Sequence, residues 1–503
     1  MKRKAAYTIL VSLVFCGLAP MTITAEDKAA LREEIIRLVE PVEKYQIIFE
    51  SFVPSPDSQH VACVARSGKK FVVMHDGKAQ KEYHSIAKET PVFSPDSQHM
   101  AYKAQEGIKW IVVRDGKEEE RFDNVSVPEY SPDSKHLAYV AQNGKKQQVV
   151  FDGKKHKAYD GIPLKHNLVF SPDSQHFAYS VLKGGKMAVV MDGKEGKEYD
   201  QVSFPIFSPD SKHMVYPARR GDKWFVVKDG EEGPEYDLVG VFRFSPDSSR
   251  FAYTAKIGGK AVMVDDGKEG PKFTDIAMPM FSPDSKHMAY LAIDGDKMLM
   301  VMDGNKGKKY DEINDLAFSP DSARYLLTVR SGKDWTAIVD GKEAGRYTNI
   351  FLPGFSPDSK HYSFMARKGE KWLLVYDGKD GTLYDFVTLA QFSRDSNHYA
   401  FMAKKGEKWV VVKDGRESQE YDGVALPMFS PDSRHFAFAA VRDNAWFVVA
   451  DGVEGNERFA GFLKGTALLF ETDDVFHILG LQLNMVSPTE ASMNIVKLKG
   501  EIK

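Results

Sequence analysis

Histidine is the residue type whose number and spacing in this chain best suit chemistry, because imidazole can bind a metal ion or transfer a proton near neutral pH. Nine of the fourteen histidines lie three residues after the aspartate of a recurring sequence, Ser-Pro-Asp-Ser or once Ser-Arg-Asp-Ser. They are His60, His99, His136, His176, His213, His287, His361, His398 and His435. Catalysis or metal binding would require several of these imidazoles to lie within bonding distance of one another.

A structural role explains this spacing better. The two remaining equivalent positions hold Arg250 and Arg324, which keep a hydrogen-bond donor but cannot serve as metal ligands. One histidine in each repeating unit also distributes the imidazoles around a molecule instead of gathering them. We therefore predict that these histidines are structural, with no catalytic residue and no metal site among them.

The aspartates of the same sequence are equally repetitive. They are Asp57, Asp96, Asp133, Asp173, Asp210, Asp247, Asp284, Asp321, Asp358, Asp395 and Asp432. Eleven copies are more than one active site could use, and each can accept hydrogen bonds from its own turn. The adjacent acids Asp265–Asp266 and Asp473–Asp474 do not form the alternating acidic loop of a calcium-binding hand.

Motifs of the common enzyme classes are absent from the sequence. It contains neither the Gly-x-Ser-x-Gly of serine hydrolases nor the Gly-x-x-x-x-Gly-Lys-Ser/Thr loop that binds phosphates. We therefore predict that the protein is not an enzyme and that it needs no cofactor.

Tryptophan offers the best candidates for binding. All six tryptophans lie 14 residues after one of the turn aspartates: Trp110, Trp224, Trp335, Trp372, Trp409 and Trp446. Aromatic side chains at the rim of a repeat fold could stack on a sugar or anchor a protein partner. Phe71 and Met298 at the same position favour packing between repeats, whereas Gln147 and Ala261 show that the position also accepts polar and small residues.

The elements that must position these residues follow from the repeat itself. Successive turn aspartates are separated by 39, 37 and 40 residues, and then seven times by 37. In the unit 207–237, a Ser-Pro-Asp turn is followed by the strand-forming segment His213–Ala218, the apolar segment Trp224–Val227 and the hairpin signal Asp229-Gly230. Four antiparallel strands in about 37 residues make one blade of a β-propeller.

The run Phe-Ser-Pro-Asp-Ser-x-His-x-Ala-Tyr resembles the WD-repeat-like propeller repeat of the TolB type, which often has Gly in place of the second Ser. The resemblance covers roughly Tyr45 to Lys499. It implies a propeller fold and protein–protein contacts in the cell envelope. The N-terminal α/β domain of that family is missing here, so its partners cannot be carried over residue by residue.

Counting a split last unit gives about twelve blades. Glu43-Lys44-Tyr45 resembles a fourth strand without the preceding three, and Asn494–Lys499 resembles a third strand without a fourth, which suggests that the two ends share one blade. Propellers typically have four to eight blades. We therefore expect two abutting rings of about six blades each, at 43–266 and 267–503, with one large closed ring as the alternative.

The N-terminal residues predict export. Lys2-Arg3-Lys4, the apolar Ala5–Ala19 and the small residue Ala25 read as a signal peptide over residues 1–25, with an uncleaved anchor as the alternative. Leu31, Ile35, Leu38 and Val39 have helical spacing, so we expect a short helical segment at 26–42, ended by Pro41. After removal of the signal we expect no membrane span and a periplasmic or extracellular location.

The net charge of −3, with lysines and acids interspersed, shows no basic face for nucleic acid. The sequence thus predicts an all-β, exported, non-enzymatic propeller scaffold that binds an unidentified protein partner in the cell envelope. Recognition of a glycan or another small ligand by the six tryptophans is the alternative.

Overall fold

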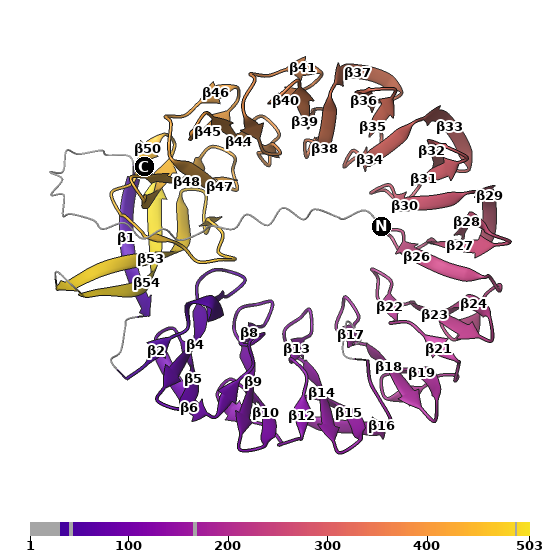
Figure 1. Cartoon of the computed structure of the whole chain (residues 1–503), viewed down its shortest axis with the longest axis horizontal. Helices are drawn as coiled ribbons and strands as arrows, with labels where there is room; N and C mark the ends of the chain where they lie inside the picture. The colour runs from indigo at the N-terminus through magenta and orange to yellow at the C-terminus, as the bar shows by residue number, and fades with distance from the viewer. Residues whose placement is uncertain (1–30, 40–43, 164–167, 488–489, 503) are drawn as a thin grey trace.

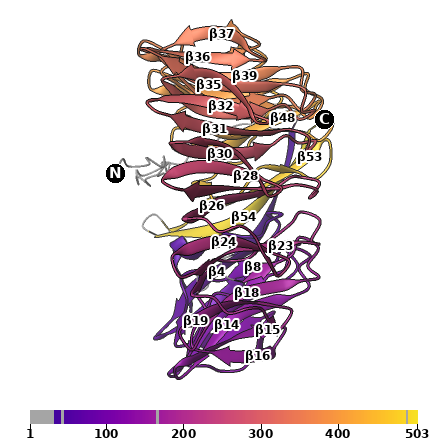
Figure 2. The same ribbon diagram turned by 90° about the vertical axis from the view of Figure 1, so that its right-hand side faces the viewer.

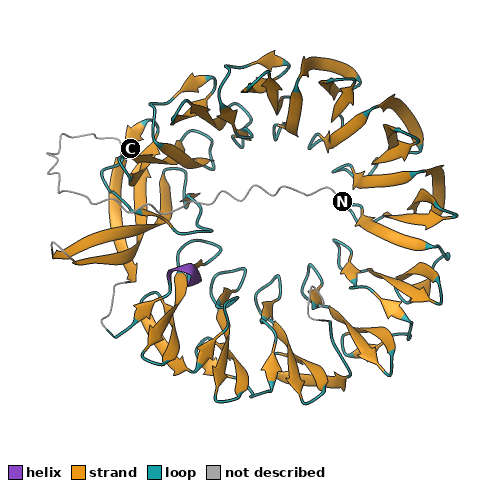
Figure 3. Cartoon of the chain, in the orientation of Figure 1, coloured by secondary structure: helices purple, strands orange, loops and turns teal. Residues whose placement is uncertain are grey.

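A computed structural model describes residues 31–39, 44–163, 168–487 and 490–502. These residues form twelve antiparallel sheets. The sheets are arranged as blades around one ring (Figure 1). Seen from the side, the strands run across the thickness of the ring (Figure 2). The described residues contain one helix, the short 3-10 helix η1 at Phe49–Ser51 (Figure 3).

Each blade has its first strand at the centre of the ring and its fourth strand at the outer rim (Figure 1). In seven blades the first strand is divided into two short pieces or only one short piece is described, and in the other five it is continuous but contains a bulge. The first strands are β2 (Gln46–Ile47), β3 (Val53–Pro54), β7 (Ser85–Ile86), β8 (Val92–Phe93), β12 (Asn124–Val125), β13 (Glu129–Tyr130), β17 (Val169–Phe170), β21 (Gln201–Val202), β22 (Ile206–Phe207), β26 (Leu238–Phe244), β30 (Asp275–Phe281), β34 (Glu312–Phe318), β38 (Asn349–Phe355), β42 (Phe386–Val387), β43 (Gln391–Phe392), β47 (Gly423–Phe429), β51 (Gly461–Phe462) and β52 (Leu469–Phe470).

The second and third strands form the core hairpin of each blade. The second strands are β4 (Val61–Ser67), β9 (Met100–Glu106), β14 (Leu137–Asn143), β18 (Phe177–Lys183), β23 (Met214–Arg220), β27 (Phe251–Ile257), β31 (Met288–Asp294), β35 (Tyr325–Ser331), β39 (Tyr362–Lys368), β44 (Tyr399–Lys405), β48 (Phe436–Arg442) and β53 (Val475–Ser487). The third strands are β5 (Lys70–His75), β10 (Lys109–Arg114), β15 (Lys146–Phe151), β19 (Lys186–Met191), β24 (Lys223–Lys228), β28 (Lys260–Asp265), β32 (Lys297–Met302), β36 (Asp334–Val339), β40 (Lys371–Tyr376), β45 (Lys408–Lys413), β49 (Ala445–Ala450) and β54 (Glu490–Ile502).

The fourth strands are shorter and more polar because they face the solvent at the rim. They are β6 (Lys78–Tyr83), β11 (Lys117–Glu118), β16 (Lys154–Tyr159), β20 (Lys194–Glu195), β25 (Glu231–Glu232), β29 (Lys268–Phe273), β33 (Asn305–Tyr310), β37 (Lys342–Tyr347), β41 (Lys379–Asp380), β46 (Arg416–Glu417), β50 (Val453–Glu454) and, in the last blade, β1 (Leu31–Val39).

The last blade closes the ring with residues from both ends of the described chain. Strand β1 pairs antiparallel with β54, with Leu31 opposite Ile502 and Ile35 opposite Leu498. The expected sharing of one blade is confirmed, but the shared strand is β1, whereas Tyr45 lies in no strand and Glu43 lies outside the described residues. Shared closure removes a free sheet edge.

The helix expected at 26–42 is wrong for residues 31–39, and residues 26–30 and 40–42 lie outside the described residues. The edge of β54 offers hydrogen bonds to an extended chain, and Leu31 and Ile35 pack on the hydrophobic cluster of the last two blades. Tertiary pairing therefore overrides the local helical pattern. The signal peptide expected at 1–25 also lies outside the described residues.

The expected pair of rings is corrected to one closed ring (Figure 1). Asp266 and Gly267, where the boundary was expected, form the turn of the β28–β29 hairpin within a single blade. The first and last blades share a cluster in which Val61 meets Leu479 and Ile495. Each blade packs on both of its neighbours through such clusters, so the ring is continuous.

Candidate functional site

The recurring histidine is bonded within its own blade. In the blade of Asp210, His213 Nδ1 lies 2.7 Å from Asp229 Oδ2, and the N–H of Met214 donates to Asp229 Oδ1 at 2.9 Å. The Ser208 hydroxyl donates to Asp210 Oδ1 at 2.6 Å and accepts from the N–H of His213 at 3.0 Å. These bonds tie the turn after the first strand to the turn before the fourth.

The same pairing occurs in all nine blades that have this histidine. The pairs are His60–Asp76, His99–Asp115, His136–Asp152, His176–Asp192, His213–Asp229, His287–Asp303, His361–Asp377, His398–Asp414 and His435–Asp451. Arg324 Nε replaces the imidazole at 2.9 Å from Asp340 Oδ2. The nine histidines and Arg324 thus make equivalent bonds within their blades, and the property that is kept at this position is a side-chain nitrogen that bonds to the aspartate.

The second serine of each turn connects neighbouring blades. The N–H of Asp210 donates to Ser248 Oγ at 2.9 Å, and Ser248 adopts a positive φ of 64°. Ten such bonds are found between the described blades, from Asp57, Asp96, Asp133, Asp173, Asp210, Asp247, Asp284, Asp321, Asp358 and Asp395. They run around the face of the ring that carries the histidines.

The opposite face carries a second set of links between blades. Asp237 accepts from Lys223 Nζ of its own blade at 2.6 Å and from the N–H of Gly258, in the next blade's hairpin loop, at 2.8 Å. The ammonium and the N–H together hold the pKa of the Asp237 carboxyl below its usual value. The preceding Tyr236 is buried between the blades. The repeated residues of the motif thus hold the ring together, and candidates for function lie where blades differ.

The six tryptophans lie at the start of third strands on six different blades, and the structure brings two of them near each other, because Trp372 and Trp409 both contact the ring of Phe386. Trp335 is buried, and the other five are half-buried. Trp110, Trp224, Trp335, Trp372 and Trp446 belong to or pack on the clusters between blades. The rings are also covered from outside, as by Lys103 Nζ at 4.4 Å from the Trp110 centroid.

Four of the exposed apolar side chains occupy equivalent positions in the first, central part of four blades. Phe204, Val241, Met278 and Leu389 are 48%, 46%, 40% and 44% exposed. Each lies six residues before a turn aspartate: Val241 and Met278 lie at a bulge in the first strand of their blades, and Phe204 and Leu389 lie between its two short pieces. These four residues, called the inner belt below, therefore occupy the same level of the ring on four blades. Sequence reasoning missed them because apolar residues within a strand suggest a core position.

One equivalent position carries a carboxylate. Asp315, on β34, is half-buried, and burial raises its pKa. The hydroxyl of Thr328 donates to Asp315 Oδ2 at 3.3 Å, and the N–H of Asp315 donates to Thr328 Oγ1 at 3.0 Å. Asp315 is therefore a polar break among the apolar residues at this level.

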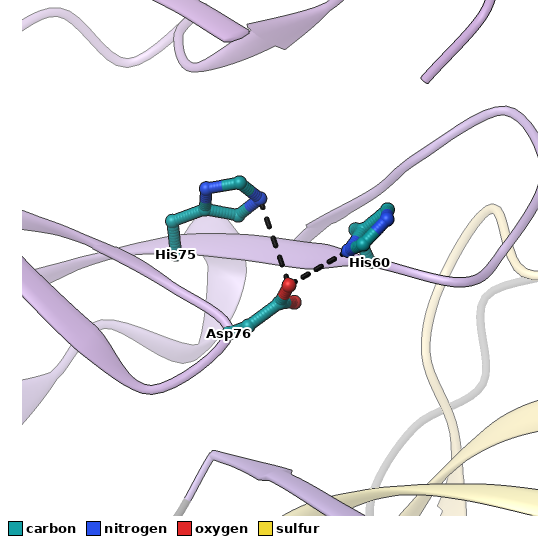
Figure 4. A group of neighbouring side chains, drawn as sticks. All are labelled: His60, His75 and Asp76. Carbon is teal, nitrogen blue, oxygen red and sulfur yellow. Dashed lines mark hydrogen bonds and ion pairs between the residues drawn. The ribbon is translucent and has the colours of Figure 1, made fainter. Parts of the chain in front are cut away.

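The first complete blade contains a group that could hold a metal ion (Figure 4). His60 Nδ1 lies 2.7 Å and His75 Nε2 lies 3.7 Å from Asp76 Oδ2. His60 and Asp76 repeat in other blades, but His75 does not. In the sequence, His75 stands directly before the aspartate of an Asp-Gly turn, and this could have indicated the group. A comparison of repeated positions alone does not reveal it, because no other blade has a histidine there.

Among the described residues, no helix is long and apolar enough to span a membrane. No protein-family model and no curated protein matches the sequence.

Several solved propeller structures share local likeness with the chain. TolB from Acinetobacter baumannii is 14% identical, with a TM-score of 0.24, over 50% of this chain and 80% of that one. The Dos1 propeller is 12% identical (TM-score 0.28; 55% and 90%). The β-propeller domain of the Trilobed protease from Pyrococcus furiosus is 13% identical (TM-score 0.25; 50% and 94%). The twelve four-stranded blades themselves make this chain a β-propeller repeat protein, consistent with the TolB-type repeat that its sequence resembles.

Proposed function

We propose that this chain is an exported, non-enzymatic scaffold that binds a protein partner in the cell envelope through the inner belt. The observation that carries the proposal is the exposure of four apolar side chains, Phe204, Val241, Met278 and Leu389, at one level of the ring. Three of them, Phe204, Val241 and Met278, lie on consecutive blades, and exposed apolar side chains on adjoining elements favour an interaction surface. An apolar segment of a second protein, inserted at the centre of the ring, would cover them.

The regular motif supports a scaffold role. Its histidines, serines and aspartates are all engaged in bonds within or between blades, as with His213–Asp229 and Asp210–Ser248. Bonds of this kind hold the turns of each blade and the neighbouring blades in fixed positions, which supports a scaffold role. We place the partner site at the inner belt and not at the six tryptophans, because five of those rings belong to or pack on the clusters between blades.

Export rests on the basic and apolar residues of the predicted signal at 1–25. A C-terminally tagged chain is expected in the periplasmic or extracellular fraction of its native cells. Recovery in the cytoplasmic fraction would contradict export without affecting the proposed surface.

Site-specific crosslinking tests the partner site. A photoreactive phenylalanine analogue is placed at Phe204 in one variant and at Lys194, on the outermost strand β20, in a matched control. We expect one protein to be captured from position 204 and not from 194, and capture to be lost when Val241→Glu is added. Equal capture at both positions, or capture unaffected by Val241→Glu, would show that the inner belt is not the contact.

A further inference from the structure

The structure assigns a binding site for a divalent transition-metal ion such as Zn²⁺ to His60, His75 and Asp76. The three side chains come from the two turns at one end of the first complete blade and point toward one another (Figure 4). Their ligand atoms all lie within 4.8 Å of each other. Two imidazole nitrogens and one carboxylate oxygen form a donor set that suits Zn²⁺ and its neighbours rather than Ca²⁺ or Mg²⁺.

The strongest indication is the unsatisfied nitrogen of His75. His75 Nε2 is buried and has no hydrogen-bond partner. It lies 3.7 Å from Asp76 Oδ2, too far for a hydrogen bond. A buried polar atom without a partner is uncommon and costs stability, so its presence requires an explanation. A metal ion between His75 and Asp76 supplies the missing contact.

The distances fit a metal ion after small movements. Zn–N and Zn–O bonds of about 2.0–2.1 Å place two ligand atoms of a tetrahedral site roughly 3.3–3.4 Å apart. The observed distances from Asp76 Oδ2, 2.7 Å to His60 Nδ1 and 3.7 Å to His75 Nε2, lie on either side of that value. Binding requires His60 Nδ1 to be unprotonated, so its bond to Asp76 is replaced by the metal.

The surroundings hold two of the three ligands in place. The N–H of Val61 donates to Asp76 Oδ1 at 2.9 Å, which leaves Oδ2 for the metal. The His75 ring meets Phe93, on the first strand of the next blade, edge to face at 5.6 Å between centroids. Such contacts around a metal site orient its ligands. Three protein ligands leave a fourth position for water or for a group of another molecule.

No other described blade can form this group. The residue equivalent to His75 is Arg114, Phe151, Met191, Lys228, Asp265, Met302, Val339, Tyr376, Lys413 or Ala450. The repeat therefore provides a histidine–aspartate pair like His60–Asp76 in nine blades. In one blade His75 adds a third ligand to that pair.

Zinc binding to the metal-stripped protein tests the site. The full-length protein is dialysed against a chelator and then titrated with Zn²⁺. The bound metal is measured by elemental analysis. We expect His75→Met to weaken binding by about 100-fold or more, since loss of even an outer contact costs 10–100-fold. Methionine occupies this position in two other blades, as Met191 and Met302, so the fold accommodates the change.

Two matched variants separate the site from the other histidines. His60→Arg keeps the pairing seen for Arg324 and Asp340 but removes a ligand, so it should abolish binding. His99→Arg makes the same change in the next blade and should leave binding unchanged. Met191→His adds the missing ligand beside His176 and Asp192 and should create a second site of similar affinity.

Cobalt provides an independent readout. Co²⁺ bound in place of Zn²⁺ should give the intense visible absorption of a tetrahedral site in the wild type and not in His75→Met. If the stripped wild type takes up no Zn²⁺, or if His75→Met binds as tightly as the wild type, the assignment is wrong.

Discussion

The backbone N–H of Asp210 donates a hydrogen bond of 2.9 Å to Ser248 Oγ, across the boundary between two blades. Ser248 has a φ of 64°, a region in which glycine has no steric penalty and other residues do. TolB-type repeats often have glycine at this place. The serine here accepts the strain of its backbone because its hydroxyl satisfies a donor of the preceding blade.

Replacing this serine should reveal both effects. Ser248→Ala keeps the strained backbone and leaves the Asp210 N–H without an acceptor, which we expect to lower the free energy of unfolding by about 1–3 kcal/mol. Ser248→Gly loses the same acceptor but relieves the strain, so it should cost less. The midpoints of urea unfolding measure the order. A Ser248→Ala protein as stable as the wild type would show that the bond contributes nothing.

His213 should be replaceable by arginine but not by alanine. Arginine at the equivalent position 324 reaches its aspartate at 2.9 Å, so His213→Arg should retain the bond to Asp229. His213→Ala removes a hydrogen bond to a charged group and should cost about 1–2 kcal/mol, discounted for partial exposure. Thermal unfolding of the two variants gives the comparison. If arginine is as harmful as alanine, the imidazole has a role beyond this bond.

The turn aspartates should make the ring sensitive to acid. The hydroxyl of Ser245 and the N–H and hydroxyl of Ser249 lower the pKa of Asp247 to about 2, and Asp395 and Asp432 are lowered to a similar value. A carboxyl whose folded pKa is below its unfolded value stabilises the fold above about pH 4, and that stability is lost as the pH falls toward 2. Melting temperature should therefore fall steeply in this range, and less steeply in Asp247→Asn. If the melting temperatures of the wild type and Asp247→Asn fall equally steeply with pH, the Asp247 carboxyl does not contribute to the acid sensitivity.

Asp315 should change the stability of the fold with pH in the opposite direction. Burial raises its pKa, so its contribution to stability is present at low pH and is lost as the pH rises through the raised value. Asp315→Leu, which copies the residue at position 389, should raise the melting temperature at pH 7.5 and raise it less at pH 4. Asp334→Leu, at an exposed position on the same blade, is the control and should show no such pH dependence.

Closure of the ring should depend on β1. Ile35 packs on the cluster that Val496 and Leu498 form in the last blade. Ile35→Asp places a charge against this cluster and should lower stability by about 1–3 kcal/mol. Hydrogen exchange of the β54 amides should become faster, whereas Glu34→Gln, on the exposed side of β1, should leave it unchanged. Unchanged exchange in Ile35→Asp would mean that β1 does not hold the last blade.

The residues of the repeat made most of the fold predictable, because each unit carries its own turns and strands. The roles of His213 and the hairpin at Asp229-Gly230 follow from local chemistry alone. The strand at Leu31–Val39 could not be found in this way, since its partner β54 lies at the far end of the sequence. The number of blades in one ring depends on the angle between neighbouring blades, and the spacing of residues in the sequence does not determine that angle.

The candidate sites were less predictable because they are departures from the repeat. The residues of the inner belt are apolar like those of the core, but the irregular middle part of the first strand leaves residues such as Phe204 exposed. None of the ten residues equivalent to His75 is a histidine. A role in metal binding can be inferred only from the fold, which places His75 near His60 and Asp76. The tryptophans were conspicuous by type, and five of them belong to or pack on the clusters between blades.

The pairing of Leu31 with Ile502 also sets the order in which the protein can be completed during synthesis. The ribosome produces β1 before any complete blade, but its partner β54 is made last, so β1 waits unpaired while eleven blades form. The entropic cost of joining two distant segments increases only slowly with the length of the chain between them. A chain that stops before β54 would therefore have two open ends, each a sheet edge able to pair with another incomplete chain.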